Sequence, residues 1–229
     1  YGATPELTTA LTGLATETKA KGWWHSYGDA IPDWFELYVG LEQAASRLRE
    51  HDDTLVPGLL QTPGYTRGVY QHRPNLPPEE LTDVLEVRRR RQEVLVRRLP
   101  KPPDTGWILS EAVLLRCVGG SAAMAEQLAH LLDRSELPNV SIRVLPLAAG
   151  AHYGALAGAF VMLDFPLVNR IVPDPSVIYS ENVTGALYLD RPHELAAYEK
   201  IWSSLEALAL DEEQSRRLIY KIKEEVHHG

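Results

Sequence analysis

The sequence has a single cysteine, Cys117, among its 229 residues. One thiol cannot form an internal disulfide, which suits a protein of the reducing cytoplasm. Long hydrophobic runs are also missing, because no apolar stretch approaches the roughly twenty residues that a membrane-spanning helix needs. We therefore expect a cytoplasmic protein that has no membrane partner.

Basic residues are fewer than acidic residues in this chain. The chain has 23 Lys and Arg against 31 Asp and Glu, which gives a formal net charge of −8. Affinity for nucleic acids depends mainly on Lys and Arg contacts to phosphate, so this chain by itself is not expected to bind DNA. Its hydrophobic content of 45% and charged content of 24% are average for ordered globular chains. The length allows a substantial core in one large domain or two small ones.

The common sequence motifs of catalysis and metal binding are absent. There is no G-x-S-x-G, no phosphate-binding glycine loop and no H-E-x-x-H. The eight histidines are scattered, and no pair inside a predicted element has ligand spacing with Cys, Asp or Glu. Cys117 lies in the apolar run VLLRCV, which favours a packed thiol over a nucleophile. The sequence therefore predicts no metal, no cofactor and no catalytic residue.

The segment 46–68 contains the clearest local structural pattern. Its first part predicts a strand, which ends at the Pro-Gly pair 57–58 because a residue before proline is pushed towards extended geometry. Thr62 followed by Pro63 is typical of a helix start, with a hydroxyl cap and a proline at the first helical position. The segment is therefore predicted as a strand, a tight turn and a capped helix.

The remaining segments alternate between helical and extended patterns. Apolar residues spaced three or four apart predict helices, and alternation with a period of two predicts strands. Prolines near 100–105 mark a possible internal boundary. The predicted helices are 4–21, 32–44, 79–99, 121–135, 192–208 and one capped by Asp211, and the predicted strands are the start of 107–118, 139–147, 159–165, 177–181 and 187–189. We predict an α+β fold in which a mostly antiparallel sheet is packed with helices.

Two features suit contacts with a partner. Aromatic residues crowd positions 23–38, where they form either a hydrophobic latch for the first helix or a stacking wall for a flat ligand. The arginine run 88–91 cannot face one partner, because four consecutive helical residues cover most of a turn. Acidic neighbours favour a solvated, ion-paired face over a phosphate or acidic-protein contact. The candidate contact residues are Trp23, Trp24, Trp34, Arg88 and Arg91.

Two carboxylates, Glu111 and Glu181, fall at or beside predicted strands. A buried carboxylate must find hydrogen-bond donors or be neutralised. Structural ion pairs or hydrogen-bond anchors are the favoured interpretation. The alternative is a ligand cavity covered by the loop that contains residues 152–153. The candidate pocket residues are Trp107, Glu111, His152, Tyr153, Tyr179 and Glu181.

Several strings follow one another along the chain. They include GWW-x2-Y (22–27), W-F-x2-Y-x2-L-E (34–42), LVPGLLQT-x2-Y-x-R (55–67), SEAVLLRCVGG (110–120), V-x-I-x-V-L-P (140–146), G-x-L-x-G-x-F (154–160) and Y-S-E-N (179–182). In this order they resemble the large C-terminal domain of actinobacterial helix-turn-helix regulators, the WhiJ-like, antitoxin-like transcriptional regulators of the XRE class. The resemblance covers nearly the whole chain.

The resemblance implies a two-part protein. In such regulators a helical DNA-binding domain precedes this one, and residues 1–21 look like the last helix of a missing or truncated domain of that kind. Residues 22–229 would then be the regulatory domain, which responds to a small molecule or a small partner protein and forms a homodimer. DNA would be bound by the N-terminal domain and not by this chain. The alternative is an enzyme or small-molecule-binding protein recruited from the regulator fold, for example a biosynthetic cyclase, with a pocket near Glu111, Glu181 and His152.

Overall fold

A six-stranded sheet in the order β3-β2-β1-β4-β5-β6 organises the computed structural model, which describes residues 22–27, 33–73, 77–166 and 176–227. Strands β1 to β3 pair in parallel, and the other three pairings are antiparallel. The strands are β1 (Arg47–Asp52), β2 (Asp104–Ser110), β3 (Val140–Leu145), β4 (Phe160–Asp164), β5 (Val177–Asn182) and β6 (Gly185–Leu189). The predicted α+β fold with a mostly antiparallel sheet is confirmed.

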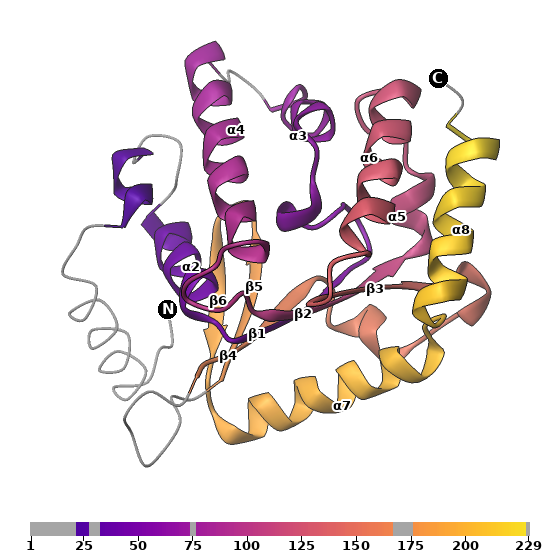
Figure 1. Cartoon of the computed structure of the whole chain (residues 1–229). Coiled ribbons are helices and arrows are strands. Elements are labelled where there is room, and N and C mark those ends of the chain that lie inside the picture. The colour runs from indigo at the N-terminus through magenta and orange to yellow at the C-terminus, as the bar shows by residue number, and fades with distance from the viewer. Residues whose placement is uncertain (1–21, 28–32, 74–76, 167–175, 228–229) are drawn as a thin grey trace.

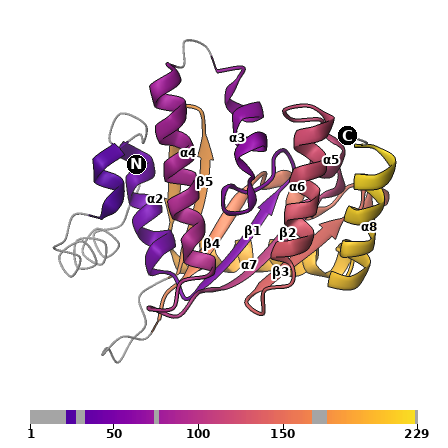
Figure 2. The ribbon, with the colours of Figure 1, turned by 45° about the horizontal axis from the view of Figure 1, so that its top comes forward.

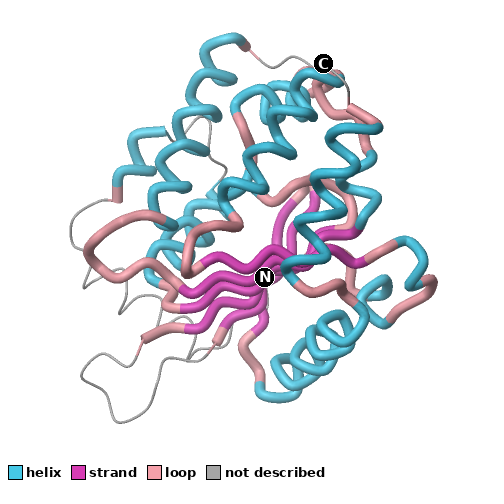
Figure 3. The backbone as a smooth tube through the Cα atoms, turned by 45° about the vertical axis from the view of Figure 1, so that its right-hand side comes forward, coloured by secondary structure: helices cyan, strands magenta, loops and turns pink. Residues whose placement is uncertain are grey.

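Helices cover both faces of this sheet, and α7 lies alone beneath it in Figure 1. In Figure 3 the strands run side by side through the middle, with helices on both sides. The helices of the larger layer are α2 (Asp33–Ala44), α3 (Pro63–Tyr70), α4 (Pro78–Gln92), α5 (Glu111–Leu115), α6 (Ser121–Arg134) and α8 (Glu212–Glu225). The smaller layer contains α7 (Pro192–Leu208) and the short 3-10 helix η5 (Tyr153–Leu156).

The two faces of the sheet follow from the alternation of side chains along each strand. In β1, Leu48 points into the core under the larger helical layer. Ile108 and Phe160, from the strands on either side of β1, belong to a second core that packs against Ile201 and Trp202 of α7. Each strand near the centre of the sheet therefore contributes side chains to two separate cores.

The segment 46–68 contains the strand and the capped helix that its local pattern predicts, but the strand is shorter. It ends at Asp52, before the Pro-Gly pair 57–58, and the 3-10 helix η2 (Gly58–Leu60) follows that pair's proline. Its strand is β1, which lies between β2 and β4 near the centre of the sheet (Figure 2). The Thr62 hydroxyl accepts a hydrogen bond from the Tyr65 backbone N–H at 3.2 Å, and Pro63 begins α3. A side-chain acceptor at this position satisfies a donor that the first helical turn leaves unpaired.

The long helix predicted over 79–99 is shorter in the structure. α4 ends at Gln92, and the 3-10 helix η3 (Glu93–Leu95) follows it. The Gln92 side-chain amide donates to the carbonyl of Gln61 at 2.7 Å, which anchors this end of α4 to the segment before α3. The chain must then return to the start of β2. The helical spacing of apolar residues could not predict this reversal, because it is set by tertiary contacts.

The possible boundary at 100–105 does not separate the two halves of the chain. Strands β1 and β2 lie on either side of this segment in sequence and pair in parallel along their whole lengths. The predicted helix 4–21, with the domain assignment 1–21, lies outside the described residues. Among the residues that are described, none of the helices combines the length and the apolar character needed to cross a bilayer.

Candidate functional site

One row of side chains crosses the sheet on the face that the larger helical layer covers. Glu50 of β1 is paired with Trp107 of β2 and with Val161 of β4. Val161 is paired with Tyr179 of β5, which in turn is paired with Tyr188 of β6. Residues paired across neighbouring strands point to the same face of the sheet, so each of these five side chains lies beside that of the next strand. We call them the sheet row.

Glu50 is the ionisable centre of the sheet row. The indole N–H of Trp107 donates to Glu50 Oε2 at 2.8 Å, and the Trp107 side chain is completely buried. Burial raises the pKa of Glu50 to about 8, and the nearby carboxylates of Asp52 and Glu42 act in the same direction. The hydrogen bond from Trp107 and the charge of Arg91 oppose this shift. Glu50 is therefore mostly protonated at neutral pH, as a carboxyl group held away from water should be.

Aromatic rings link the sheet row to α2. The Tyr179 ring stacks on Tyr38 with ring centres 4.1 Å apart, and Tyr38 in turn stacks on Phe35 at 5.3 Å. The Tyr179 hydroxyl donates to Glu181 on the same strand. At the edge of the sheet, the Tyr188 hydroxyl donates to the backbone carbonyl of Trp34 at 2.7 Å. α2 is thus attached to β5 and β6 by stacking and by a hydrogen bond.

A buried ion pair joins α4 to α2 above the sheet row. Arg91 donates from Nε and Nη2 to the two carboxylate oxygens of Glu42 at 2.9 and 2.6 Å. Arg91 is 4% exposed and Glu42 is 0% exposed. The guanidinium carbon also lies 4.9 Å from the Phe35 ring centre and 5.3 Å from that of Tyr38. Arg91 was a candidate surface contact, and the structure corrects this: its position on the inner side of α4 places it against Glu42.

The other arginines of the run have separate environments. Arg89 and Arg90 both pair with Glu86 at the surface, which confirms the ion-paired face for these two. The Arg90 guanidinium also lies over the Trp23 and Tyr27 rings, at 5.6 and 5.5 Å. Arg88 packs against Gly58, and its Nε has no hydrogen-bond partner among the described residues. Consecutive positions of α4 therefore face solvent, the N-terminal aromatic residues and the protein interior.

Comparison with protein families gives one match. Residues 35–221 match the family described as "Domain of unknown function (DUF5753)". The chain belongs to this family. A comparison with curated proteins found none that matches, and a comparison with solved structures found none either. The matched region begins within α2 and ends within α8, so the DUF5753 domain includes the whole sheet, the sheet row and the pair formed by Arg91 and Glu42.

The predicted pocket residues of this DUF5753 domain do not form one group. Trp107, Tyr179 and Glu181 lie on the larger helical side, in or beside the sheet row. Glu111 begins α5 and accepts a hydrogen bond from the Leu147 backbone N–H at 2.8 Å, as a structural anchor would. The remaining two, His152 and Tyr153, lie at η5, which packs against α7 on the opposite side of the sheet.

The other candidate contact residues lie near the N-terminal end of the described chain. Trp23 and Trp24 belong to the 3-10 helix η1 (Trp23–Tyr27), and their rings meet edge to face at 5.9 Å. Trp34 is half-buried and packs against the core. The aromatic residues of this region therefore join η1 and α2 to α4 and the sheet. The predicted latch for the first helix concerns residues 4–21, which lie outside the described residues.

The described residues also include possible metal ligands and the single cysteine, Cys117. In the described part of the chain, no group of three or more His, Cys, Asp and Glu side chains is arranged to hold a metal ion. Cys117 is exposed, so the expectation of a packed thiol was wrong. The apolar run around it divides at the end of α5, where Leu114 points into the core and the following residues turn outward.

Sequence reasoning missed Glu50 and Glu42, the acidic residues at the centre of this site. Glu50 is two residues from Leu48 in β1 and therefore shares its inward face, which the alternation of the strand could have revealed. Glu42 gave no comparable pattern, because its partner Arg91 is 49 positions away in the sequence. Chemically, the site offers a protonatable carboxyl, a buried ion pair and stacked aromatic rings within one layer.

Proposed function

We propose that this DUF5753 domain is the sensing and interaction part of a cytoplasmic, DNA-binding transcriptional regulator of the helix-turn-helix class. In this proposal DNA is bound by a helical domain N-terminal to residue 22, and the sheet and its helices respond to a small molecule or a small partner protein. The net charge of −8 supports this division, because an acidic domain repels the phosphate backbone. The order of sequence strings that resemble such regulators supports the same assignment.

The observation that carries the proposal is the arrangement of Arg90 and Arg91. Arg90 lies over the Trp23 and Tyr27 rings, which belong to the first described residues of the chain. Its neighbour Arg91 is bound to Glu42 above the sheet row. Any displacement of α4 therefore acts on both the N-terminal aromatic residues and the buried site. A sensing domain requires such a connection between its buried site and the segment that leads to the DNA-binding domain.

The proposed mechanism is a shift between two positions of α4. An effector changes such an equilibrium only if it binds one state more tightly than the other. The buried pair formed by Arg91 and Glu42 makes the position of α4 sensitive to an effector. An effector that separates the two side chains leaves each of them as a buried charge without its partner, which is energetically costly. An effector at the sheet row would thus alter how α4 holds η1 and the segment before it.

A symmetric dimer completes the proposed regulator. Two copies related by a twofold axis would place two DNA-binding heads on successive turns of the major groove. The dimer would recognise an operator with two half-sites about 34 Å apart. Its mass is measured directly by size-exclusion chromatography with light scattering.

The test compares two proteins in a gel-shift assay with DNA from the gene's own promoter region. We expect the protein encoded by the complete reading frame to bind this fragment and the 229-residue chain to leave it free. The control is an unrelated fragment of equal length. Specific retention of the promoter fragment by the 229-residue chain would contradict the proposed division, and so would a complete reading frame without DNA-binding activity.

Glu50 favours a second candidate function, an enzyme or small-molecule-binding protein. A carboxyl group with a pKa of about 8 can donate a proton at neutral pH, as general acids do. The two functions differ in the fate of the ligand. A regulator returns its effector unchanged, whereas an enzyme converts it in a reaction that Glu50→Gln abolishes. Mass spectrometry of the ligand after incubation with the wild-type chain and with this variant distinguishes them.

A further inference from the structure

The two edges of the sheet differ in how their outer backbone groups are used. At one edge is β3, where the Val144 carbonyl accepts from the Leu210 backbone N–H at 2.9 Å and the Val144 N–H donates to the Ser215 hydroxyl at 2.9 Å. The other edge is β6, and β5 is the single described strand that pairs with it. A further strand can add to an unpaired edge. β6 is therefore the edge of this sheet that is open to a partner.

The register of the β5–β6 hairpin shows which groups of β6 are free. Asn182 and Gly185 are paired directly across a two-residue turn, so they exchange backbone hydrogen bonds with each other. Hydrogen-bonded and non-hydrogen-bonded pairs alternate along an antiparallel ladder, so Leu187 also bonds to β5. The N–H and C=O groups of Ala186 and Tyr188 then point outward, and no other described residue bonds to them.

β6 also lacks the features that protect an edge strand from pairing. Natural edges are blunted by charged side chains, proline, bulges or a covering element. The sequence of β6 is GALYL, which has no charge and no proline, and its ladder with β5 runs without a bulge over five consecutive pairs. Leu187, at its centre, is 58% exposed. This edge is uncharged in a chain whose net charge is −8, so it suits a contact between two acidic copies.

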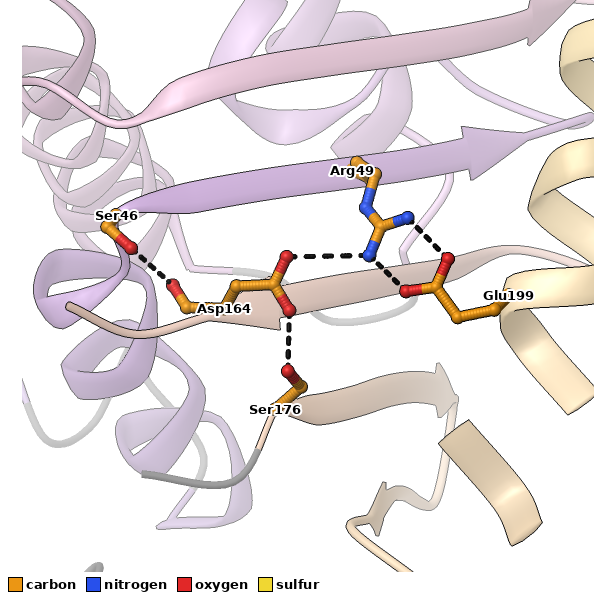
Figure 4. Close-up of polar contacts among 5 residues, drawn as sticks. All are labelled: Ser46, Arg49, Asp164, Ser176 and Glu199. Carbon is orange, nitrogen blue, oxygen red and sulfur yellow. Dashed lines mark hydrogen bonds and ion pairs between the residues drawn. The ribbon is translucent and has the colours of Figure 1, made fainter. Parts of the chain in front are cut away.

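The helix of the smaller layer leaves this edge uncovered. α7 is held over β1, because Arg49 donates to both carboxylate oxygens of Glu199 at 2.7 and 2.6 Å. Arg49 Nη2 also lies 3.4 Å from a carboxylate oxygen of Asp164 in β4, and Asp164 accepts a hydrogen bond from the Ser176 hydroxyl at 2.6 Å (Figure 4). These contacts fix α7 near the centre of the sheet. Leu187, on the same face of β6, stays exposed.

The sizes of the residues along β6 fit a second copy of the same strand. In an antiparallel pair centred on Leu187, the free groups of Ala186 and Tyr188 in one copy bond to those of Tyr188 and Ala186 in the other. The bulky Tyr188 then lies opposite the small Ala186, and Leu189 lies opposite Gly185. The two Leu187 side chains meet on the twofold axis as a non-hydrogen-bonded pair, in which side chains are closest. Bulky residues therefore do not collide on either side of the axis.

We propose that this chain forms a twofold dimer in which β6 of one copy pairs antiparallel with β6 of the other. The two six-stranded sheets then become one continuous sheet. Such an interface is isologous, because the same patch is used by both copies. It gives the dimer of the proposed function its contact surface, and its role in DNA binding rests on that function.

The interface also brings the two buried sites together. Tyr188 is the last member of the sheet row, and its hydroxyl donates to the Trp34 carbonyl of α2 at 2.7 Å. In the dimer the backbone of Tyr188 bonds to the other copy, so the sheet rows of the two copies meet at the axis. An effector that moves the sheet row in one copy therefore acts on the dimer contact as well.

The first test is sedimentation velocity of the 229-residue chain over a concentration series. We expect a reversible equilibrium between monomer and dimer. Leu187→Lys places two lysines opposite each other and should raise the dissociation constant of the dimer about tenfold or more, because like charges on paired strands repel. Leu147→Lys is the matched control. Leu147 is 56% exposed and follows β3 at the opposite edge, so this variant should dimerise as the wild type does.

A disulfide tests the register. Leu187→Cys is made in a Cys117→Ser background, because the native thiol is exposed. Two cysteines in a non-hydrogen-bonded pair have a Cα separation of about 4.5 Å, which lies within the range that a disulfide allows. We expect mild oxidation to convert this variant into a covalent dimer. Leu147→Cys in the same background should cross-link at least about tenfold more slowly, since its thiols are held at opposite ends of the dimer.

Three results would each overturn the proposal. They are a chain that stays monomeric over the whole series, equal dimerisation of Leu187→Lys and Leu147→Lys, and equal cross-linking of the two cysteine variants. A monomer would leave β6 free for a strand of another protein. The gel-shift assay separates this interface from the regulatory function. A dimer that depends on Leu187 in a protein without DNA-binding activity keeps the interface and removes the function, whereas DNA binding by a dimer that tolerates Leu187→Lys does the reverse.

Discussion

Arg90 and Arg91 are neighbours in α4, yet their guanidinium groups occupy opposite environments. Arg90 lies at the surface over the Trp23 ring, 5.6 Å from its centre. Arg91 is 4% exposed and makes two hydrogen bonds to Glu42. Successive helical residues differ by about 100° in direction, which explains how one helix serves both contacts. The consecutive arginines of this run therefore do not form one positively charged surface.

Removal of Arg91 should destabilise the protein strongly. Arg91→Ala leaves the carboxylate of Glu42 buried without a partner, which typically costs about 3–5 kcal/mol. Arg89→Ala is the control, because it breaks exposed pairs with Glu86 and Glu93 and should cost less than about 1 kcal/mol. Urea denaturation of both variants measures the free energies of unfolding. Similar values for the two would contradict the importance of the buried pair.

Stability should fall as the pH rises towards 8, because of Glu50. Its folded pKa of about 8 lies above the usual carboxyl value of 4.5, so between these values the folded state binds more protons than the unfolded state. The free energy of unfolding then decreases with pH in this window. The loss across this window should be on the order of a few kcal/mol, because a pKa difference of one unit corresponds to about 1.4 kcal/mol.

Glu50→Gln isolates this contribution. Glutamine keeps an oxygen that accepts from Trp107 and cannot ionise. We expect the variant to lose less stability than the wild type between pH 5 and pH 8, measured by urea denaturation at several pH values. His51, whose pKa is lowered by burial, is present in both proteins and its contribution is common to both curves. Parallel curves for the two proteins would show that Glu50 is ionised in the folded state.

The start of α3 depends on its cap. Thr62→Ala removes the acceptor for the Tyr65 backbone N–H and should destabilise the protein by about 1–2 kcal/mol. Thr82→Ala serves as the control, since Thr82 is exposed within α4 and its change should stay within about 0.5 kcal/mol. Thermal and urea unfolding measure both. Equal effects would mean that the hydroxyl of Thr62 does not hold the helix start.

A close approach between two backbones makes Gly68 sensitive to substitution. A Cβ atom at this position in α3 would lie 2.5 Å from the backbone nitrogen of Gly119, where no flexible side chain can move aside. We expect Gly68→Ala to cost about 1–3 kcal/mol, as overpacking does. Gly40→Ala in α2 meets no such contact and should be neutral or stabilising by up to about 1 kcal/mol. Differential scanning fluorimetry would reveal the opposite signs.

Prediction from sequence was accurate where the cause is local. The capped helix start at Thr62 and Pro63 was predicted because a hydroxyl cap and a proline at the first helical position act within a few residues. The strand of the same segment was predicted too, although it ends at Asp52 and not at the Pro-Gly pair. The end of α4 was not predicted, since it is set by the contact between Gln92 and the carbonyl of Gln61, 31 positions away. Of the predicted pocket residues, Trp107, Tyr179 and Glu181 share one side of the sheet, whereas His152 belongs to the other.

The sequence by itself determined the element types, the α+β class and the alternation that gives each central strand two faces, because these follow from steric and hydrophobic periodicity along the chain. Only the tertiary structure decided that β1 lies between a parallel and an antiparallel neighbour. That order places Glu50 beside Trp107, 57 positions away, and places Arg49 against Glu199 of α7. Strand pairing joins residues that are distant in sequence, and the burial of a charge depends on what covers it, which no local pattern contains.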